Sequence, residues 1–146
     1  MNVKQISVQL NHVPGTLYEM TTVLANNGIN IRALTVAQST DTSTVRIIVD
    51  NIIWASSVLR NMGFEPAYTE VIAVEVPNSP GGLNKIIEVL KNGYINIEYL
   101  YNIGTKYAHN SRNTCIIFKF TDNEKAVEVL NSAGIRLLGH GDLSAL

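Results

Sequence analysis

An internal repeat is the feature of this sequence that most limits its fold. Shifting the sequence by 66 residues places residues 8–34 on residues 74–100 without a gap, and 11 of the 27 aligned positions are identical. Further along the chain the shift becomes 71, so the second copy carries about five extra residues, most simply between Lys106 and Asn113. The repeat predicts two similar structural units with a boundary near Glu70.

Each copy has the hydrophobic pattern of a strand–helix–strand–strand–helix–strand unit. Alternating apolar residues predict strands, and apolar residues at helical spacing predict the helices between them. The order is that of the split βαβ, ferredoxin-like arrangement, which predicts an α+β fold of two βαββαβ units, each an antiparallel sheet with its helices on one face. The expected strands cover 3–10, a segment beginning at 29–31, 44–50 and a segment after Gly63 in the first copy, and 70–76, a segment beginning at 95–97, 115–121 and a segment after Gly134 in the second.

The same pattern indicates which helix residues are buried and where the first helix of each copy ends. Asn and Gly tolerate the left-handed conformation that stops a helix, so we expect stops at residues 26–28 and 92–93. The expected buried faces contain Leu17, Met20, Leu24, Val58, Leu59 and Met62 in the first copy, and Leu83, Ile86, Ile87, Leu90, Val127, Leu130 and Ala133 in the second.

Short polar residues precede the second helix of each copy and predict its N-cap. Asp50 is expected to cap this helix in the first copy, and Thr121 or Asp122 in the second. Residues 121–124 also have the Thr-x-x-Glu form of a capping box, in which Thr121 and Glu124 would satisfy two backbone N–H groups.

The composition excludes several classes of protein. Hydrophobic residues make up 46% and charged residues 16% of the 146, which is a globular composition. The net charge is −1 with no basic stripe, no apolar run is long enough to span a bilayer, and the N-terminal residues lack the pattern of a signal peptide. We therefore expect a cytoplasmic protein that binds neither nucleic acid nor membrane.

The Pro-Gly turn after the first strand of each copy is the first candidate binding site. Glycine lets the backbone approach a ligand, and the free N–H groups of the helix start suit a carboxylate. The alternative interpretation is a tight turn without a ligand, because a repeat shows shared ancestry rather than a shared ligand. The candidate residues are His12, Val13, Pro14, Gly15, Thr16 and Leu17 in the first turn and Asn78, Ser79, Pro80, Gly81, Gly82 and Leu83 in the second.

Two asparagines and a group of aromatic residues are further candidates. Asn30 and Asn96 each lie between two isoleucines, where an amide can accept from an ammonium and donate to a carboxylate, or can simply face outward. The aromatic side chains of the second copy can line a pocket or fill an interface or core. They are Tyr94, Tyr99, Tyr101 and Tyr107, accompanied by His109.

The residues that other chemistries need are missing from the expected places. His12, His109 and His140 are too dispersed for a metal site, and we expect no cofactor. Neither turn has the Arg of an acylphosphatase or the Cys-x-x-Cys of a metal chaperone, and the Lys/Arg-Gly-Phe pattern of an RNA-binding RRM is absent. Cys115 lies in an apolar strand, which favours an inert core thiol. We therefore expect a protein that is not an enzyme.

The order of these motifs resembles the ACT domain family. The strand, x-x-Pro-Gly-x-Leu turn, helix, Asn-Gly stop and Ile-Asn-Ile segment occur at 3–69 and again at 70–146. The chain is most similar to short bacterial proteins made only of two ACT domains, which implies one ACT domain at 1–69 and another at 70–146.

The resemblance implies a regulatory protein of amino acid metabolism that binds a free amino acid at the interface between ACT domains. In the family, the turn holds the carboxylate through backbone N–H groups, and the residue two before Pro and the strand asparagine hold other polar groups. Asn78 fits this pattern and His12 does not, which favours the second turn with Asn30 or Asn96. The sequence leaves the amino acid open between one such as His and the branched residues Leu, Ile or Val.

Two functions from different classes follow from the resemblance. The first is an allosteric sensor, expected to form a homodimer, whose ligand changes the packing of its domains. The second is a regulatory subunit or assembly module, in an acetolactate-synthase-like role, that acts mainly through protein contacts with a metabolic enzyme. The intact Pro-Gly turns favour the sensor.

Overall fold

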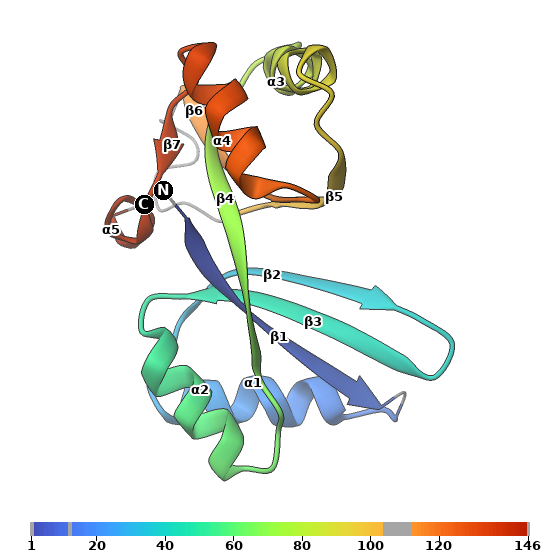
Figure 1. Cartoon of the computed structure of the whole chain (residues 1–146). Helices are drawn as coiled ribbons and strands as arrows, with labels where there is room; N and C mark the ends of the chain where they lie inside the picture. Colours follow the sequence, from blue (N-terminus) through green and yellow to red (C-terminus); the bar gives the residue numbers. More distant parts are fainter. Residues whose placement is uncertain (1, 12, 104–111, 146) are drawn as a thin grey trace. The chain divides into compact units, whose positions relative to one another are not determined.

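The computed structural model describes residues 2–11, 13–103 and 112–145 (Figure 1). The chain divides into a first unit, residues 4–69, and a second unit, residues 70–146 with residues 1–3. No helix within the described residues is long and apolar enough to cross a membrane. The elements are β1 (Val3–Asn11), α1 (Thr16–Asn26), β2 (Ile31–Gln38), β3 (Thr42–Val49), α2 (Ile52–Asn61), β4 (Ala67–Pro77), α3 (Gly82–Asn92), β5 (Ile97–Asn102), β6 (Asn113–Phe120), α4 (Asn123–Ser132), β7 (Leu137–Leu138) and α5 (His140–Ser144).

The first unit packs α1 and α2 on one face of an antiparallel sheet (Figure 1). The strand β3 pairs with β1 on one side and with β2 on the other. Because side chains alternate along a strand, every second residue of β1 and β3 enters the core beneath the helices. This core contains Ile6, Val8, Leu10, Met20, Leu24, Val45, Ile47, Val49, Ala55 and Leu59.

The second unit repeats this arrangement, with β7 as its last strand. Its antiparallel pairs are β5–β6, β6–β4 and β4–β7, which is the strand order of a ferredoxin-like sheet. The predicted α+β fold of βαββαβ units is confirmed. The core contains Ile72, Val74, Val76, Ile86, Leu90, Ile116, Phe118, Phe120, Ala126 and Leu130, and the rings of Phe118 and Phe120 stack with centroids 5.3 Å apart.

Four residues expected on the buried helix faces are exposed instead. Leu17 and Leu83 lie in the first turns of α1 and α3, and their side chains are 38% and 36% exposed. Met62 and Ala133 are the C-cap residues that follow α2 and α4, and both are exposed. Helical spacing places these residues on the correct face, but the helix ends extend beyond the core that would cover them.

Of the two predicted helix caps, the one at Asp50 is wrong and the one at Thr121 or Asp122 is confirmed. Asn51 caps α2, because its Oδ1 accepts a hydrogen bond from the Trp54 N–H, whereas Asp50 forms an ion pair with Arg32 at 3.1 Å. Asp122 caps α4 by accepting from the Lys125 N–H, as one of the two alternatives predicted.

The predicted capping box at residues 121–124 does not form. The hydroxyl of Thr121 lies 2.8 Å from the Asn96 side-chain nitrogen, which donates to it. Because Asp122 takes the N-cap position instead, Thr121 is free to tie the end of β6 to the start of β5.

The end of α3 also differs from its expected form. Tyr94, with φ of 57°, adopts the left-handed conformation that Gly28 adopts in the first copy, whereas Gly93 has φ of −86°. A Cβ at Gly93 would lie 2.7 Å from the Val129 side chain. Gly93 is thus the C-cap residue at the predicted stop, and its missing side chain also allows α3 and α4 to pack closely.

Candidate functional site

The first Pro-Gly turn presents free backbone donors at the start of α1. Gly15 is the N-cap residue with φ of 98°, a conformation that glycine adopts without strain, and no side chain caps the helix. The Glu19 N–H donates to the Gly15 carbonyl, but the N–H groups of Leu17 and Tyr18 have no hydrogen bond within the described residues. The first turn of α1 therefore offers two donors and the positive end of the helix dipole.

The second turn repeats this backbone arrangement closely. Gly81 is the N-cap residue of α3 with φ of 85°, and again no side chain caps the helix. The Lys85 N–H donates to the Gly81 carbonyl, and the N–H groups of Leu83 and Asn84 have no hydrogen bond within the described residues. Both copies therefore keep a helix start whose donors remain available.

The two turns differ at the residue after this glycine. The hydroxyl of Thr16 donates to the carbonyl oxygens of Asn11 and Val13 in the first copy. Gly82 takes its place in the second copy, where a Cβ would lie 2.0 Å from the Pro77 carbonyl oxygen. The start of α3 thus approaches its strand too closely for any side chain, which gives Gly82 a structural reason that needs no ligand.

A pocket of about 360 Å³ lies beside the first turn. Its wall combines the turn with the facing ends of β2 and β3, so it joins the free helix donors to an apolar surface. Five of the predicted site residues line it together. The lining residues are Leu10, Asn11, Val13, Pro14, Gly15, Thr16, Leu17, Val36, Gln38, Ser43 and Val45.

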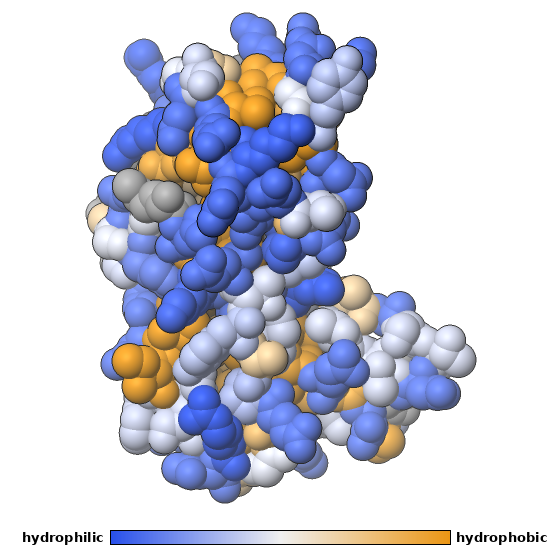
Figure 2. Space-filling model, in the orientation of Figure 1, coloured by the Kyte–Doolittle hydropathy of each residue, from blue (hydrophilic) through white to orange (hydrophobic). Residues whose placement is uncertain are grey.

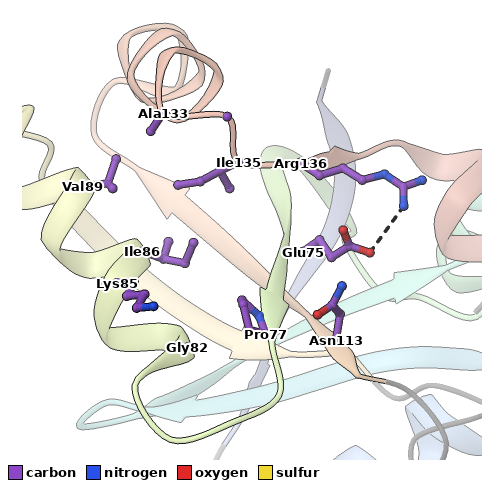
Figure 3. A pocket seen from close by; sticks show the side chains of 11 residues that line it. Glu75, Pro77, Gly82, Lys85, Ile86, Val89, Asn113, Ala133, Ile135 and Arg136 are labelled. Carbon is purple, nitrogen blue, oxygen red and sulfur yellow. Dashed lines mark hydrogen bonds and ion pairs between the residues drawn. The ribbon is translucent and has the colours of Figure 1, made fainter.

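The surroundings of the second turn are only partly within the described residues. The connection between β5 and β6 falls largely in residues 104–111, outside the described ranges. His12, Tyr107 and His109 also lie outside these ranges. Of the second-turn candidates, Gly82 lines a separate cavity between α3 and β4 (Figure 3). Asn78 donates its backbone N–H to the Arg112 carbonyl.

Neither asparagine can reach the turn of its own unit. Asn96 is at the start of β5 beside Thr121, whereas the second turn follows Pro77, which pairs with Asn113 at the other end of β6. The length of β6 separates these ends by about 20 Å at the usual rise of a strand. Asn30 precedes Ile31, which pairs with Val49, whereas Asn11 pairs with Thr42 beside the first turn. In both units the asparagine and the turn lie at opposite ends of the sheet.

The aromatic residues of the second copy and Cys115 show no arrangement of a binding or reactive site within the described residues. The rings of Tyr99 and Tyr101 stack with centroids 6.5 Å apart, Tyr101 is buried, and Tyr94 is exposed. Burial raises the pKa of the Cys115 thiol to about 12, and the neighbouring Glu75 carboxylate adds to the rise. Because the reactive form of a cysteine is the thiolate, this thiol is unreactive near neutral pH.

A family model described as an ACT domain pair matches residues 1–146. The chain belongs to this family. A crystal structure of a protein from Bacteroides thetaiotaomicron is similar over 100% of this chain and 98% of its own, with 32% identity and a TM-score of 0.89. None of the curated proteins matches the chain.

Two more distant solved structures share the fold of this ACT domain pair. The regulatory subunit of aspartate kinase from Thermus thermophilus matches 89% of this chain and 91% of its own, with 16% identity and a TM-score of 0.60. The aspartokinase alpha and beta subunits match 90% of this chain and 91% of theirs, with 18% identity and a TM-score of 0.56. The resemblance to the ACT family is thus confirmed, whereas the boundary between domains at 1–69 and 70–146 stays a prediction, because the family model spans both together.

One feature of this ACT domain pair was not predicted from its sequence. The cavity beside Gly82 is bordered by Glu75, Lys85 and Arg136, which come from three separate elements or their connections. A comparison of the aligned copies offers a signal for it, because these positions correspond to Gln9, Glu19 and Glu65 in the first copy, and two of the three change charge sign.

Proposed function

We propose that this ACT domain pair is a non-catalytic, cytoplasmic sensor that binds a free amino acid at its Pro-Gly turns. The observation that carries the proposal is the repeated helix start, where a left-handed glycine leaves two backbone donors without a side-chain cap. Donors at a helix N-terminus suit the carboxylate common to all amino acids. The pocket beside the first turn adds an apolar wall for a side chain.

The proposed site needs polar groups beyond the turn. The ammonium group of the ligand requires an acceptor, and Asn30 and Asn96 are the proposed ones. Because each asparagine lies far from its own turn, a second ACT domain would supply it. Asn78 favours the second turn, and the pocket supports the first, so the proposal includes both.

A thermal-shift screen against the twenty amino acids tests this function. A ligand that binds only the folded protein increases its free energy of unfolding, by roughly 2.7 kcal/mol at a hundredfold excess over the Kd, and so raises the melting temperature. We expect one amino acid, or a few related ones, to raise it. No shift with any of them at millimolar concentration would contradict the proposal.

Two aspartate substitutions provide a matched test of the first turn. Val13 lines the pocket and is 59% exposed, whereas Ile53 is 77% exposed and lies outside the pocket-lining residues. Val13→Asp should repel the ligand carboxylate and weaken binding about tenfold or more, and Ile53→Asp should leave it unchanged. Equal binding by both variants would exclude the first turn, and Asn78→Ala or a bulky residue at Gly81 would then test the second.

A second candidate function is supported by apolar surface on the first unit. Figure 2 shows hydrophobic residues over the beginning of α2, where Ile53 is largely exposed, and Trp54 and Met62 on the same helix are also exposed. Exposed apolar patches are typical of protein interaction sites. The chain would then act as a regulatory subunit of a metabolic enzyme or form a homodimer, and a pulldown would recover a stable partner even when no amino acid binds.

A further inference from the structure

A second small-molecule site is indicated by the cavity of the second unit. It has a volume of about 380 Å³ and opens between α3, β4 and the connection from α4 to β7 (Figure 3). Gly82 is part of its wall, so the cavity borders the second Pro-Gly turn, but its other lining residues lie outside the turn. They are Glu75, Pro77, Lys85, Ile86, Val89, Asn113, Ala133, Gly134, Ile135 and Arg136.

Charged groups lie at both ends of this cavity, Arg136 with Glu75 at one end and Lys85 on α3 at the other (Figure 3). Arg136 Nη1 lies 3.4 Å from Glu75 Oε1, and Nη2 lies 3.8 Å from Asp142 Oδ1. Both distances exceed those of a good charge-assisted hydrogen bond, so the guanidinium keeps donors for another oxygen. Lys85 has no ion pair within the described residues. The cavity wall thus carries two cations and one carboxylate.

The cavity wall between these charged groups is aliphatic. Ile86 is 4% exposed, and with Val89, Ala133 and Ile135 it forms a wall between α3 and the end of α4. The close-up view shows the Ile86 and Ile135 side chains facing the same space, with Lys85 on α3 beside Ile86 and Arg136 on the opposite side next to Glu75 (Figure 3). A ligand with a charged end and a branched apolar body matches this division.

The internal repeat provides a comparison for the charges. A cavity of about 310 Å³ lies at the equivalent place in the first unit, lined by Gln9, Leu10, Asn11, Thr16, Gly63, Phe64 and Glu65. The repeat aligns Gln9 with Glu75 and Glu65 with Arg136, and it aligns Glu19 with Lys85. The first copy therefore has acidic residues where the second has its two cations. The shared fold explains both cavities, but it does not explain the reversal of charge.

We propose that the cavity of the second unit binds a small carboxylate with a branched aliphatic body and that the equivalent cavity of the first unit does not. Arg136 binds the carboxylate, the charge of Lys85 attracts it from the opposite end of the cavity, and the aliphatic wall holds the body. A 2-oxo acid and an amino acid share this chemistry, and Glu75 is placed to accept from the ammonium group that only the amino acid has. The inference does not rest on the amino acid site proposed at the turns.

Titration calorimetry with three related probes tests the proposal. The probes are 4-methylpentanoate, 4-methyl-2-oxopentanoate and leucine, with uncharged 4-methylpentanamide as the comparison. We expect the full-length protein to bind at least one carboxylate at least tenfold more tightly than the amide. Equal binding of the amide, or no binding of any carboxylate, would overturn the proposal.

Charge-reversal variants taken from the repeat locate the binding. Lys85→Glu and Arg136→Glu introduce the residue type of the first copy, and each should weaken carboxylate binding at least tenfold. Glu19→Lys and Glu65→Arg are the reciprocal controls, and both should leave it unchanged. The milder Lys85→Gln, with melting curves for every variant, separates lost binding from lost folding. Unchanged binding by folded Lys85→Gln and Arg136→Glu proteins would overturn the site.

One further variant distinguishes binding at this cavity from binding at the turns. Another distinguishes an amino acid ligand from a 2-oxo acid. Val13→Asp should leave carboxylate binding at the cavity unchanged, so the failure of one site is distinguishable from that of the other. Glu75→Gln should weaken leucine and spare the 2-oxo acid if the natural ligand is an amino acid. A carboxylate whose binding responds to Val13→Asp but not to Lys85→Gln would contradict the cavity assignment.

Discussion

Gly82 has no side chain because the start of α3 lies directly against the preceding strand. A Cβ at this position would lie 2.0 Å from the Pro77 carbonyl oxygen, and the opposing atom is backbone, which cannot move aside cheaply. In the first copy, the Thr16 hydroxyl instead bridges to the carbonyl of Asn11, the counterpart of Pro77. The two turns therefore share a backbone path but not the same contact with the strand.

Replacing Gly82 tests this contact. Gly82→Ala should reduce the free energy of unfolding by about 2 kcal/mol or more, even though alanine favours a helix by about 1 kcal/mol. Gly141→Ala in α5 is the control, because a Cβ there meets nothing within 4 Å, and it should be neutral or stabilising by up to about 1 kcal/mol. Urea unfolding measures both, and equal stabilities would show that the close approach is absent in solution.

Cys115 makes the stability depend on alkaline pH. Its pKa rises from 9.0 to about 12 through burial, with a further contribution from Glu75, so the folded protein holds this proton more tightly than the unfolded chain. The stability from this group is complete below pH 9 and falls by about 1.4 kcal/mol per pH unit as the pH rises toward 12.

Urea unfolding at pH 8, 9.5 and 10.5 checks this dependence. Cys115→Ala lacks the thiol, so its stability should fall less steeply with pH than that of the wild type, while other titrating groups affect both alike. Slopes that agree between the two proteins would show that the thiol is not protected in this way.

At the scale of elements, strand and helix positions are predictable from the sequence because hydrophobic periodicity records which face is buried. The strand expected at 70–76 is confirmed in this way, with Ile72, Val74 and Val76 in the core. Helix ends are less predictable, because several polar residues precede each helix and the backbone geometry selects one. The close packing of Gly93 against Val129 was also not predictable from local sequence, because Val129 lies 36 residues further along the chain.

The cap of α4 tests which polar residue the geometry selects. Asp122→Ala removes the acceptor of the Lys125 N–H and should cost about 1 kcal/mol of unfolding free energy. Glu124→Ala should change it by no more than about 0.5 kcal/mol, since the predicted capping box is not formed. Chemical denaturation of both variants measures the difference. A larger loss of unfolding free energy for Glu124→Ala would show that the capping box forms after all.

At the scale of the whole molecule, duplication gives two units with one fold and different surface chemistry. The repeat and its motifs predict the ACT fold and the positions of both turns, because these depend on local sequence. The cavity of the second unit is lined by Glu75, Lys85 and Arg136, which are separated in the sequence and come to line one cavity only when the unit folds. The site residues at the turns stay a prediction, because their ligand contacts depend on groups outside each turn.

The most direct test of the sensor is the response of individual backbone amides to an amino acid. Two-dimensional NMR of the labelled protein follows the N–H signals of Leu17, Tyr18, Leu83 and Asn84 during titration with the ligand from the thermal screen. We predict that the pair of signals at one or both turns moves downfield and saturates, because a carboxylate accepts from these donors. Saturable binding that leaves all four signals unchanged would contradict the account.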